Sequence, residues 1–599
     1  MRKFLPLIFI ILIGLLVRTF RIEHAPSRLT HDEMSIGYNA YSIAQTGLDE
    51  WGRKLPLSFE AFGDYKLPGY IYSVVPFISL IGLNTISLKL PSIIAGIFII
   101  IFSYFITLKI TNNQQTSLFT AALIALSPWP IHISRMALES NLALAFYSGG
   151  LFFSLSIFDK DLKNETKTKK EIINKKSLTI KLLLSGLLFA LSSYTYVAFR
   201  LITVLTLFSL SIINIKKKKQ LKKSFLIWLS FLVILIPLVP QLLGRSGSAR
   251  FSQVSIFSDQ GIEAKVTEQR NFCFLQQQSG LPKLCKVLYN KYFYIGEKIS
   301  KNYLSFILPT FIFLDGDKLE YLNNPDFGQF SIILIPFYLI GLYQLVQNNK
   351  EKYGDKTKII YLLLAFLFTP LSSALVGDPQ IVRGSGLLLF IAIFSAIGLT
   401  YISSLIKNKN LQKISLAVIS LIFLFNFSQY FISYNYIYAA QYENYIYQLD
   451  QRTVSHLNEV ENNFDKIYIS NHFPDAHILL AFYNKIDPAY YQANIIRPIA
   501  DGFGFAHPSN LGKYHFGDQK LIEQLCLTDN SLYLSFNDEL PAGWKIEENE
   551  ANNYVYEIKG FSGVHTQVKF FDLKRIKEYL IVNNLLENTC KNYTKLLII

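Results

Sequence analysis

The sequence has 599 residues, of which 51% are hydrophobic and 17% charged, and its formal charge is +15. A mean hydropathy of +0.28 and apolar runs of 15 to 22 residues between Phe4 and Phe431 exclude collagen-like, disordered and small disulfide-framework proteins. The pI near 9.2 first suggests a nucleic-acid-binding protein. The location of the positive charge in the sequence tests this interpretation.

The excess positive charge lies in four lysine-rich segments with net charges of +4, +6, +2 and +3, at 159–181, 215–223, 348–358 and 407–413. Each lies between apolar runs, and short basic loops beside membrane spans stay on the cytoplasmic side. Solvated loops without further function would carry the same charge. The segments lack the interleaved aromatics of a nucleic-acid surface. The charge therefore indicates a lipid bilayer as partner, and no nucleic acid.

The apolar runs predict a polytopic α-helical membrane protein with about eleven spans. The spans are predicted at 4–20, 88–110, 117–129, 140–158, 181–196, 200–214, 224–243, 329–347, 359–375, 387–406 and 414–434. The first run begins like a signal peptide, but Arg18, Arg21 and Glu23 follow in place of a cleavage site, so we predict an uncleaved span. The run at 68–84 is interrupted by prolines and glycines, and we predict a juxtamembrane or re-entrant segment there, which keeps every basic loop cytoplasmic.

This topology predicts a multi-pass protein of the cell membrane, with its N-terminus in the cytoplasm and its C-terminal tail on the extracytoplasmic side. Residues 1–435 form the predicted transmembrane domain, with outer loops at 21–87 and 244–328, and residues 436–599 form an extracytoplasmic α/β domain. In that domain, alternating residues predict strands at 466–470, 531–535 and 554–558 and a helix at 477–484.

Four cysteines lie in the segments predicted to face outward. Cys273 and Cys285 share the long outer loop, and Cys526 and Cys590 share the tail. An oxidising compartment would allow one disulfide in each pair, although the sequence leaves free thiols equally open. Cys-x-x-Cys and His-x-x-x-His patterns do not occur, so no metal or other cofactor is indicated, although a divalent ion remains compatible.

Acidic and basic residues cluster in the first outer loop, as His31-Asp32-Glu33 and as Asp64-Tyr65-Lys66. An acidic pair at the mouth of a span is costly unless it is solvated or used. Capping of the following helix by Thr30 or Asp32 would explain the same residues. Catalysis and capping both stay open on these residues alone.

Further polar side chains lie in the other predicted outer turns: His132, Arg135 and Glu139 in the second, Arg200 in the next and Arg383 in a later one. A lone arginine at such a position commonly reaches toward lipid headgroups. Three arginines and a lysine with two acidic motifs on one face indicate a site for a phosphorylated, lipid-anchored substrate. His31 and His132 are expected to be structural rather than catalytic.

In this order, Asp32-Glu33, the Asp64-Tyr65-Lys66-x-Pro68 stretch and the Pro128-x-x-Ile-x-x-Ser-Arg135 turn resemble the GT-C glycosyltransferase superfamily. The likeness is to the branch of protein O-mannosyltransferases and the lipid A aminoarabinose transferase, and it covers about residues 1 to 400. The Trp-Trp-Asp motif of oligosaccharyltransferases is absent.

The resemblance implies an inverting glycosyltransferase that moves a sugar from a polyprenyl-phosphate donor to the hydroxyl of a glycan, lipid or protein acceptor, on the extracytoplasmic face. It assigns Asp32 as the base and Glu33 as its support. The donor phosphate would be bound by Lys66, Arg135, Arg200 and Arg383, with Asp64, Tyr65, His132 and Glu139 supporting. Asp64 stands where the lipid A branch commonly has glutamate, which leaves the sugar and acceptor open.

Two other function classes remain. A transporter or lipid-linked sugar flippase would place ionisable groups near the bilayer midplane, often with repeated halves, whereas here they gather on one predicted face and no repeat is visible. A membrane-anchored binding module would act through its tail, which carries no recognisable site in the sequence.

Overall fold

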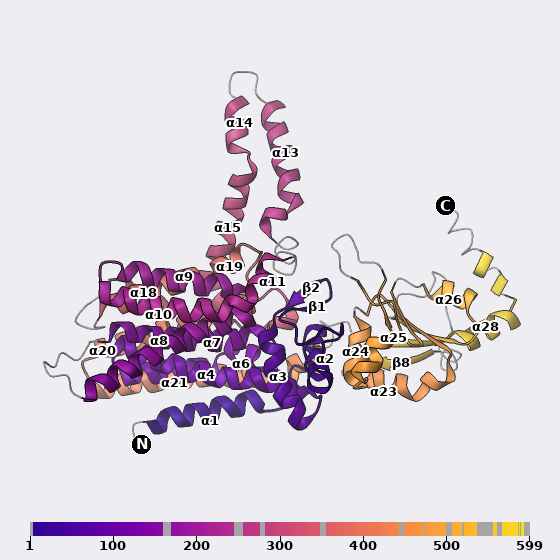
Figure 1. The fold of residues 1–599 in the computed structure, drawn as a ribbon, viewed down its shortest axis with the longest axis horizontal. Coiled ribbons are helices and arrows are strands. Elements are labelled where there is room, and N and C mark those ends of the chain that lie inside the picture. The colour runs from indigo at the N-terminus through magenta and orange to yellow at the C-terminus, as the bar shows by residue number, and fades with distance from the viewer. Residues whose placement is uncertain are drawn as a thin grey trace. The chain divides into compact units, whose positions relative to one another are not determined.

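The computed structural model (Figure 1) describes residues 4–159, 169–244, 255–275, 282–347, 355–442, 449–473, 475–498, 506–517, 520–535, 555–559, 566–584, 586–587 and 589–591. The chain forms two compact units. The first contains residues 1–22, 67–70 and 89–434, and the second contains 23–66, 71–88 and 435–599.

Eight helical segments within the described residues are long and apolar enough to cross a membrane. Three of these segments are single helices: Thr85–Thr111 (α4), Val197–Asn214 (α9) and Leu387–Leu405 (α20). The segment Glu139–Phe158 contains α7 (Glu139–Ser154) and the turn after it, and Lys176–Thr195 is part of α8 (Lys169–Thr195). The other three each contain two helices: Lys218–Gln241 has α10 (Lys218–Leu235) and the start of α11 (Val239–Leu243), Lys356–Ala374 has α18 (Lys356–Phe368) and α19 (Leu371–Ala374), and Lys409–Gln441 has α21 (Lys409–Ile432) and α22 (Ala439–Gln441). The predicted polytopic helical class is therefore confirmed in outline.

A ninth span is possible by length and composition as a bent helix pair. Helices α5 (Gln114–Leu126) and α6 (Pro128–Arg135) meet at an angle of 52°. The bend falls at Ser127, directly before Pro128, because a proline cannot donate the hydrogen bond that would continue the first helix. The two remaining predicted spans coincide with the shorter apolar helices Leu5–Thr19 (α1) and Ile332–Gln347, which contains α16 (Ile335–Gln347).

The run at 68–84, which was excluded from the predicted spans, forms α3 (Pro68–Ile81), which is also a shorter apolar helix and contains Pro76.

Two sets of contacts join the ends of other helices in the first unit. At one end of the first unit, the Asp159 carboxylate lies 3.3 Å from the ammonium groups of both Lys109 and Lys358. The Trp129 indole donates to the Ile381 carbonyl at 3.1 Å, which joins α6 to the turn before α20. The ends that meet are those that the predicted topology places on one side.

Glycines set the closest approach of two helices in the first unit. A Cβ added at Gly341 of α16 would overlap the carbonyl of Phe394 in α20, and one added at Gly398 would overlap the carbonyl of Phe337. Small residues at such a crossing let two backbones meet, as in many membrane helix pairs.

Within the first unit, the predicted outer loop 244–328 is largely helical. It contains α13 (Gln260–Leu275), α14 (Pro282–Leu288) and α15 (Lys291–Ile307), and Figure 1 shows α13 running beside α14 and α15 as a hairpin. Cys273 and Cys285 form a disulfide that joins α13 to α14, with Cα atoms 6.0 Å apart. The first of the two possible cysteine pairs is therefore a disulfide.

The second unit is built on a seven-stranded sheet with the order β4-β5-β6-β3-β7-β9-β8. Its strands are β3 (Lys466–Ser470), β4 (Ile495–Ile496), β5 (Asn510–Leu511), β6 (Tyr514–Gly517), β7 (Ser531–Ser535), β8 (Val555–Lys559) and β9 (Thr566–Asp572). The central strand β3 runs parallel to β6 and β7, and the other pairs are antiparallel. The three predicted strands are present as β3, β7 and β8, and the predicted helix is α24 (Ala476–Tyr483).

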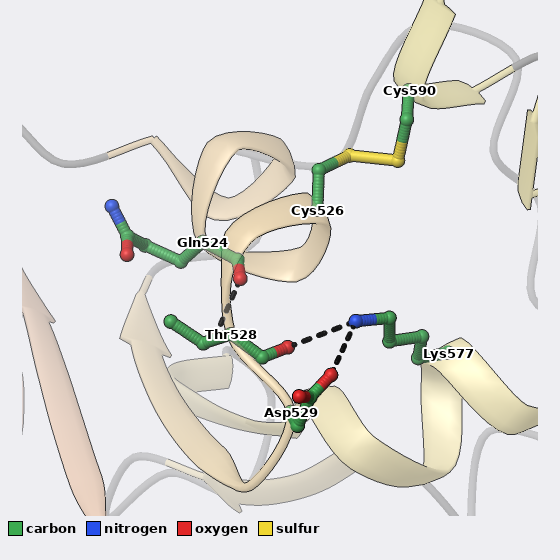
Figure 2. Close-up of a disulfide and its surroundings, with 6 residues drawn as sticks. All are labelled: Gln524, Cys526, Thr528, Asp529, Lys577 and Cys590. Atoms are coloured by element: carbon green, nitrogen blue, oxygen red, sulfur yellow. Dashed lines mark hydrogen bonds and ion pairs between the residues drawn. A yellow bond between two sulfur atoms is a disulfide. The ribbon is translucent and has the colours of Figure 1, made fainter.

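Helices α26 (Leu521–Leu527) and α28 (Leu573–Val582) lie against this sheet and share a core with Tyr468, Tyr533 and Phe571. Cys526 of α26 forms a disulfide with Cys590, which makes the second cysteine pair a disulfide as well (Figure 2). Beside it, the Lys577 ammonium lies 2.6 Å from the Asp529 carboxylate and donates to the Thr528 carbonyl, as Figure 2 also shows. These links join Cys590 to α26 and α28 to the turn that follows α26.

The second unit also contains part of the predicted outer loop 21–87. Helix α2 (His31–Thr46) packs against α24, where Gly37 lies so close to Phe482 that a Cβ would stand 2.6 Å from its ring. The Tyr38 hydroxyl donates to the Ile486 carbonyl at 3.0 Å. The predicted division into 1–435 and 436–599 did not include this grouping, which joins residues 23–66 to the tail in one unit.

Candidate functional site

The start of α2 is fixed by a capping box. The Thr30 hydroxyl accepts a hydrogen bond from the Glu33 backbone N–H at 3.2 Å, and the Thr30 backbone N–H donates to the Glu33 carboxylate at 2.9 Å. Glu33 is only 1% exposed. Glu33 thus holds the first turn of the helix, and the capping interpretation applies to Thr30 and Glu33. The neighbouring Asp32 is left outside this cap.

Asp32 forms an ion pair with Lys66, so these two residues, which the sequence analysis assigned to one site, are in contact. Lys66 ends β2 (Asp64–Lys66), which pairs antiparallel with β1 (Phe59–Ala61). Its ammonium donates a short hydrogen bond to Oδ1 of Asp32. The Lys66 side chain is 9% exposed, whereas that of Asp32 is 47% exposed. The pair therefore combines a held cation with a carboxylate that a substrate can reach.

A tight turn places an aromatic ring beside this pair. Phe62 and Gly63 join β1 to β2, and both have positive φ, of 52° and 70°. A two-residue hairpin loop with φ above zero at both positions suits glycine far better than phenylalanine. The Phe62 ring packs edge-on against His31 at 5.2 Å and lies 5.8 Å from the Lys66 ammonium. The turn thus helps to fix Lys66 and His31 around Asp32.

The tail adds a second acid, Asp475, which the sequence did not single out. It directly precedes α24 with φ of 56° and makes no side-chain cap hydrogen bond to that helix. Burial raises the pKa of its carboxyl to about 6, against the opposing charges of His31 and His507 and with the negative charge of Asp32 adding to the rise. A lone aspartate before a helix resembles a cap in the sequence, and only the packing of α24 on α2 reveals its neighbours.

A small recess of about 20 Å³ adjoins Phe62 and Asp475, enough for one water-sized group. Its other lining residues are Glu50, Trp51, Glu60, Ala61, His477, Arg497, Ala506, His507 and Pro508. The Arg497 guanidinium stacks on the Trp51 ring, 3.9 Å from its centre. Burial raises the pKa of Glu50 to about 7 and lowers that of His477 to about 3. The walls are therefore polar and aromatic, with a neutral histidine.

The remaining predicted residues of this loop lie in β2. Asp64 pairs with Ala61 and Tyr65 with Glu60 across the hairpin, and both side chains are half-buried. Among the described residues, no group of three or more His, Cys, Asp or Glu side chains is arranged to hold a metal ion.

Arg135 and His132 lie in the first unit on α6, and both are buried. The Arg135 guanidinium donates to the carbonyls of Val17, Arg18 and Arg21, at 2.8, 3.3 and 3.2 Å, so it caps the C-terminal end of α1. His132 Nδ1 lies 2.9 Å from the Tyr434 hydroxyl. These contacts are structural. Glu139 is half-buried at the first position of α7.

Arg200 and Arg383 also belong to the first unit, and both are half-buried. Arg200 lies in the first turn of α9 and donates to the Ser193 carbonyl at 3.3 Å. Arg383 lies in the turn before α20, and its backbone carbonyl accepts from Ser373 at 2.7 Å. A Cβ at Gly386 would stand 3.7 Å from Phe199, so the segments that carry the two arginines adjoin each other.

The chain resembles known glycosyltransferases in sequence. Residues 8–244 match the family model described as dolichyl-phosphate-mannose-protein mannosyltransferase. The match covers less than half of the chain and includes Asp32, Lys66, Arg135 and Arg200. It confirms, over this segment, the predicted resemblance to the mannosyltransferase branch of the GT-C superfamily. No curated protein sequence matches the chain.

Solved structures of two proteins resemble the chain at low sequence identity. ArnT from Cupriavidus metallidurans, bound to undecaprenyl phosphate, is 10% identical, with a TM-score of 0.47 over 94% of this chain and 97% of that one. The oligosaccharyltransferase AglB from Archaeoglobus fulgidus, in complex with an inhibitory peptide and a dolichol-phosphate, is 14% identical, with a TM-score of 0.45 over 80% of this chain. The chain spans 59% of the length of AglB.

Proposed function

We propose, on the premise that residues 8–244 match the mannosyltransferase family model, that the protein is a membrane glycosyltransferase that moves a sugar from a polyprenyl-phosphate donor to a hydroxyl acceptor. The observation that carries the proposal is the pairing of Asp32 with Lys66. It joins a reachable carboxylate to a held cation, which are the two groups that this transfer requires.

Asp32 acts as the general base in this proposal. The acceptor oxygen attacks the anomeric carbon of the sugar while its proton passes to Asp32, and the bond from that carbon to the phosphate oxygen breaks. The electron pair leaves with the polyprenyl phosphate, and a single displacement inverts the anomeric centre. A positioned base of this kind contributes roughly 10²- to 10⁴-fold in rate.

Lys66 balances the charge of the leaving phosphate. Its ammonium has three N–H donors, so it can bind a phosphate oxygen while it still donates to Asp32. Since Lys66 is 9% exposed, water screens this interaction less than at a free surface. The positive charge would then act where negative charge develops in the transition state.

Arg200 and Arg383 remain our proposed further contacts of the donor phosphate. Both guanidinium groups are half-buried, and among the described residues the Arg200 guanidinium donates to one backbone carbonyl, that of Ser193. A planar guanidinium with unused donors suits a phosphate. Arg135 is not proposed as a phosphate contact, because its donors are bound to α1.

We propose the extracytoplasmic face as the place of reaction and the cell membrane as the location. Two features support this. The lysine-rich segments favour the cytoplasm for the loops that contain them, while residues 23–66 belong to none of them. The second unit, which contains Asp32 and Lys66, also contains the Cys526–Cys590 disulfide, typical of an oxidising compartment.

The decisive test is transfer by the purified full chain in nanodiscs from polyprenyl-phosphate sugars, beginning with the mannosyl derivative. Asp32→Asn should reduce transfer at least 100-fold while the melting temperature stays unchanged. Asp529→Asn is the matched control, because it removes a 94% exposed carboxylate of the same unit, which forms an ion pair with Lys577. Wild-type transfer rates in Asp32→Asn would disprove the base assignment.

A further inference from the structure

The Asp475 carboxylate is placed beside the proposed base but has no partner in its own helix. It precedes α24 without capping it, and no other described side chain or backbone group forms a hydrogen bond with this carboxylate. Its backbone is left-handed, with φ of 56°, a conformation that aspartate adopts more readily than most other non-glycine residues.

The charged groups that interact with Asp475 come from three parts of the second unit. Helix α2 contributes His31 and Asp32, and β2 contributes Lys66. The segment at 506–508 contributes His507. Charged groups that line the adjoining recess are Glu50, Glu60 and Arg497, and His477 follows two positions along α24. Asp475 therefore interacts with the Asp32–Lys66 pair and also borders the recess.

The recess fixes what can bind there. Its volume of about 20 Å³ admits one water-sized polar group and not a sugar ring or an alkyl chain. Phe62 lines the recess and also contacts His31 beside the proposed base, through a ring distance of 5.2 Å. Asp475 borders this recess and also interacts electrostatically with Asp32.

We propose that Asp475 binds the acceptor, accepting a hydrogen bond from a hydroxyl next to the reacting one, and that the acceptor is accordingly a carbohydrate. This inference rests on the proposed glycosyltransferase function. A monohydroxyl lipid or a serine or threonine side chain offers no second hydroxyl. A site built to bind a hydroxyl discriminates strongly against analogues that lack it, because the polar group of the protein is then left unpaired.

The raised pKa of Asp475 predicts how this binding depends on pH. Above about pH 6 the carboxyl is charged and accepts the hydroxyl hydrogen bond strongly. As the pH falls below that value, protonation weakens the bond. The acceptor KM of the wild-type protein should therefore rise below pH 6, and the rise should be absent in Asp475→Asn.

The experiment compares the full-length wild-type protein and Asp475→Asn in nanodiscs, with a mannose disaccharide, a threonine-containing peptide and octanol as acceptor probes. Asp475→Asn should raise the disaccharide KM about 10- to 100-fold, the loss expected for one charge-assisted hydrogen bond, with kcat and undecaprenyl phosphate affinity nearly unchanged. Asp475→Glu should restore part of the affinity. Asp529→Asn is the control, and unchanged melting temperatures establish folding.

An unchanged disaccharide KM, a fall in kcat alone, or a preference for the peptide or octanol would overturn the inference. Calorimetric titration of the disaccharide in the absence of donor tests acceptor binding by Asp475 independently of sugar transfer. If the wild-type protein transfers no sugar, the transferase proposal fails, and disaccharide binding that Asp475→Asn weakens still supports Asp475. Equal binding, or none, by both proteins then overturns the role of Asp475.

Discussion

The guanidinium of Arg28 lies 3.1 Å from the carboxylate of Asp450, and both side chains are almost fully buried, at 5% and 9% exposure. The two residues are 422 positions apart in the sequence, and both belong to the second unit. Although burial alone would raise the pKa of Asp450, Arg28 and the Thr453 hydroxyl and N–H hold it below its usual value. The pair therefore joins the N-terminal part of this unit to the tail.

Arg28→Ala should lower the free energy of unfolding by about 1 to 3 kcal/mol, because it removes the buried cation beside Asp450 and leaves only the half-exposed Arg452, 2.9 Å away, as an ion-pair partner. Thermal unfolding in detergent, followed by circular dichroism, measures the change. Because the pKa of Asp450 is lowered on folding, its stabilising effect is present above the unfolded value near 3.8 and is lost as the pH falls below it. Arg53→Ala, which removes a more exposed ion pair with Glu60, should cost much less.

Glu50 predicts a second pH effect, of opposite sign. Burial raises its pKa from 4.5 to about 7, so its contribution to stability is fully present below pH 4.5 and declines as the pH rises to 7. The melting temperature of the wild-type protein should fall over this range, and Glu50→Gln should reduce the fall. Equal pH profiles for the two proteins would show that Glu50 is already ionised in the folded state at low pH.

Lys66→Ala should mainly weaken donor binding. Loss of one charge-assisted contact to phosphate predicts a rise of about 10- to 100-fold in the dissociation constant for undecaprenyl phosphate, measured by calorimetry in nanodiscs. Lys54→Ala is the matched control, since it removes an exposed lysine of the same N-terminal segment. An unchanged donor affinity in Lys66→Ala would remove Lys66 from the phosphate site.

Substitution of Arg135 and of Arg383 should have different effects, the first on the stability of the protein and the second on donor binding. Arg135→Ala removes its hydrogen bonds to the carbonyls of Val17 and Arg21 at the end of α1, at a cost of about 1 to 3 kcal/mol for each carbonyl left unsatisfied, so it should lower the melting temperature. Arg383→Ala should leave the melting temperature nearly unchanged and weaken undecaprenyl phosphate binding. The reverse pattern would exchange the two roles.

The sequence predicted most of the regular structure because its signals are local. Apolar runs identify the helices of the first unit, and alternating residues identify β3 and β7 with the bounds that the structure has. The short strands β4 and β5, of two residues each, have no such pattern. Their pairing depends on contacts that a periodicity does not encode.

The candidate site was only partly predictable for the same reason. Asp32 and Lys66 lie in short motifs, so the sequence could bring them together. Asp475 comes near them through the packing of α24 on α2, which brings together residues more than 400 positions apart. For Arg135 the residue was visible in the sequence but its contacts were not. An arginine in a polar turn has the same sequence pattern whether it binds a phosphate or caps a neighbouring helix.

The grouping of residues 23–66 with the tail sets the order in which the protein becomes functional. Arg28 leaves the ribosome 422 residues before Asp450, an interval of about 20 to 80 s at ordinary rates of synthesis. During that time α2 lacks α24, whose Phe482 packs against Gly37, and the Ile486 carbonyl to which Tyr38 donates. A chain interrupted before α24 would thus retain its membrane helices and its base, yet would lack Asp475 and the other tail residues of the proposed site.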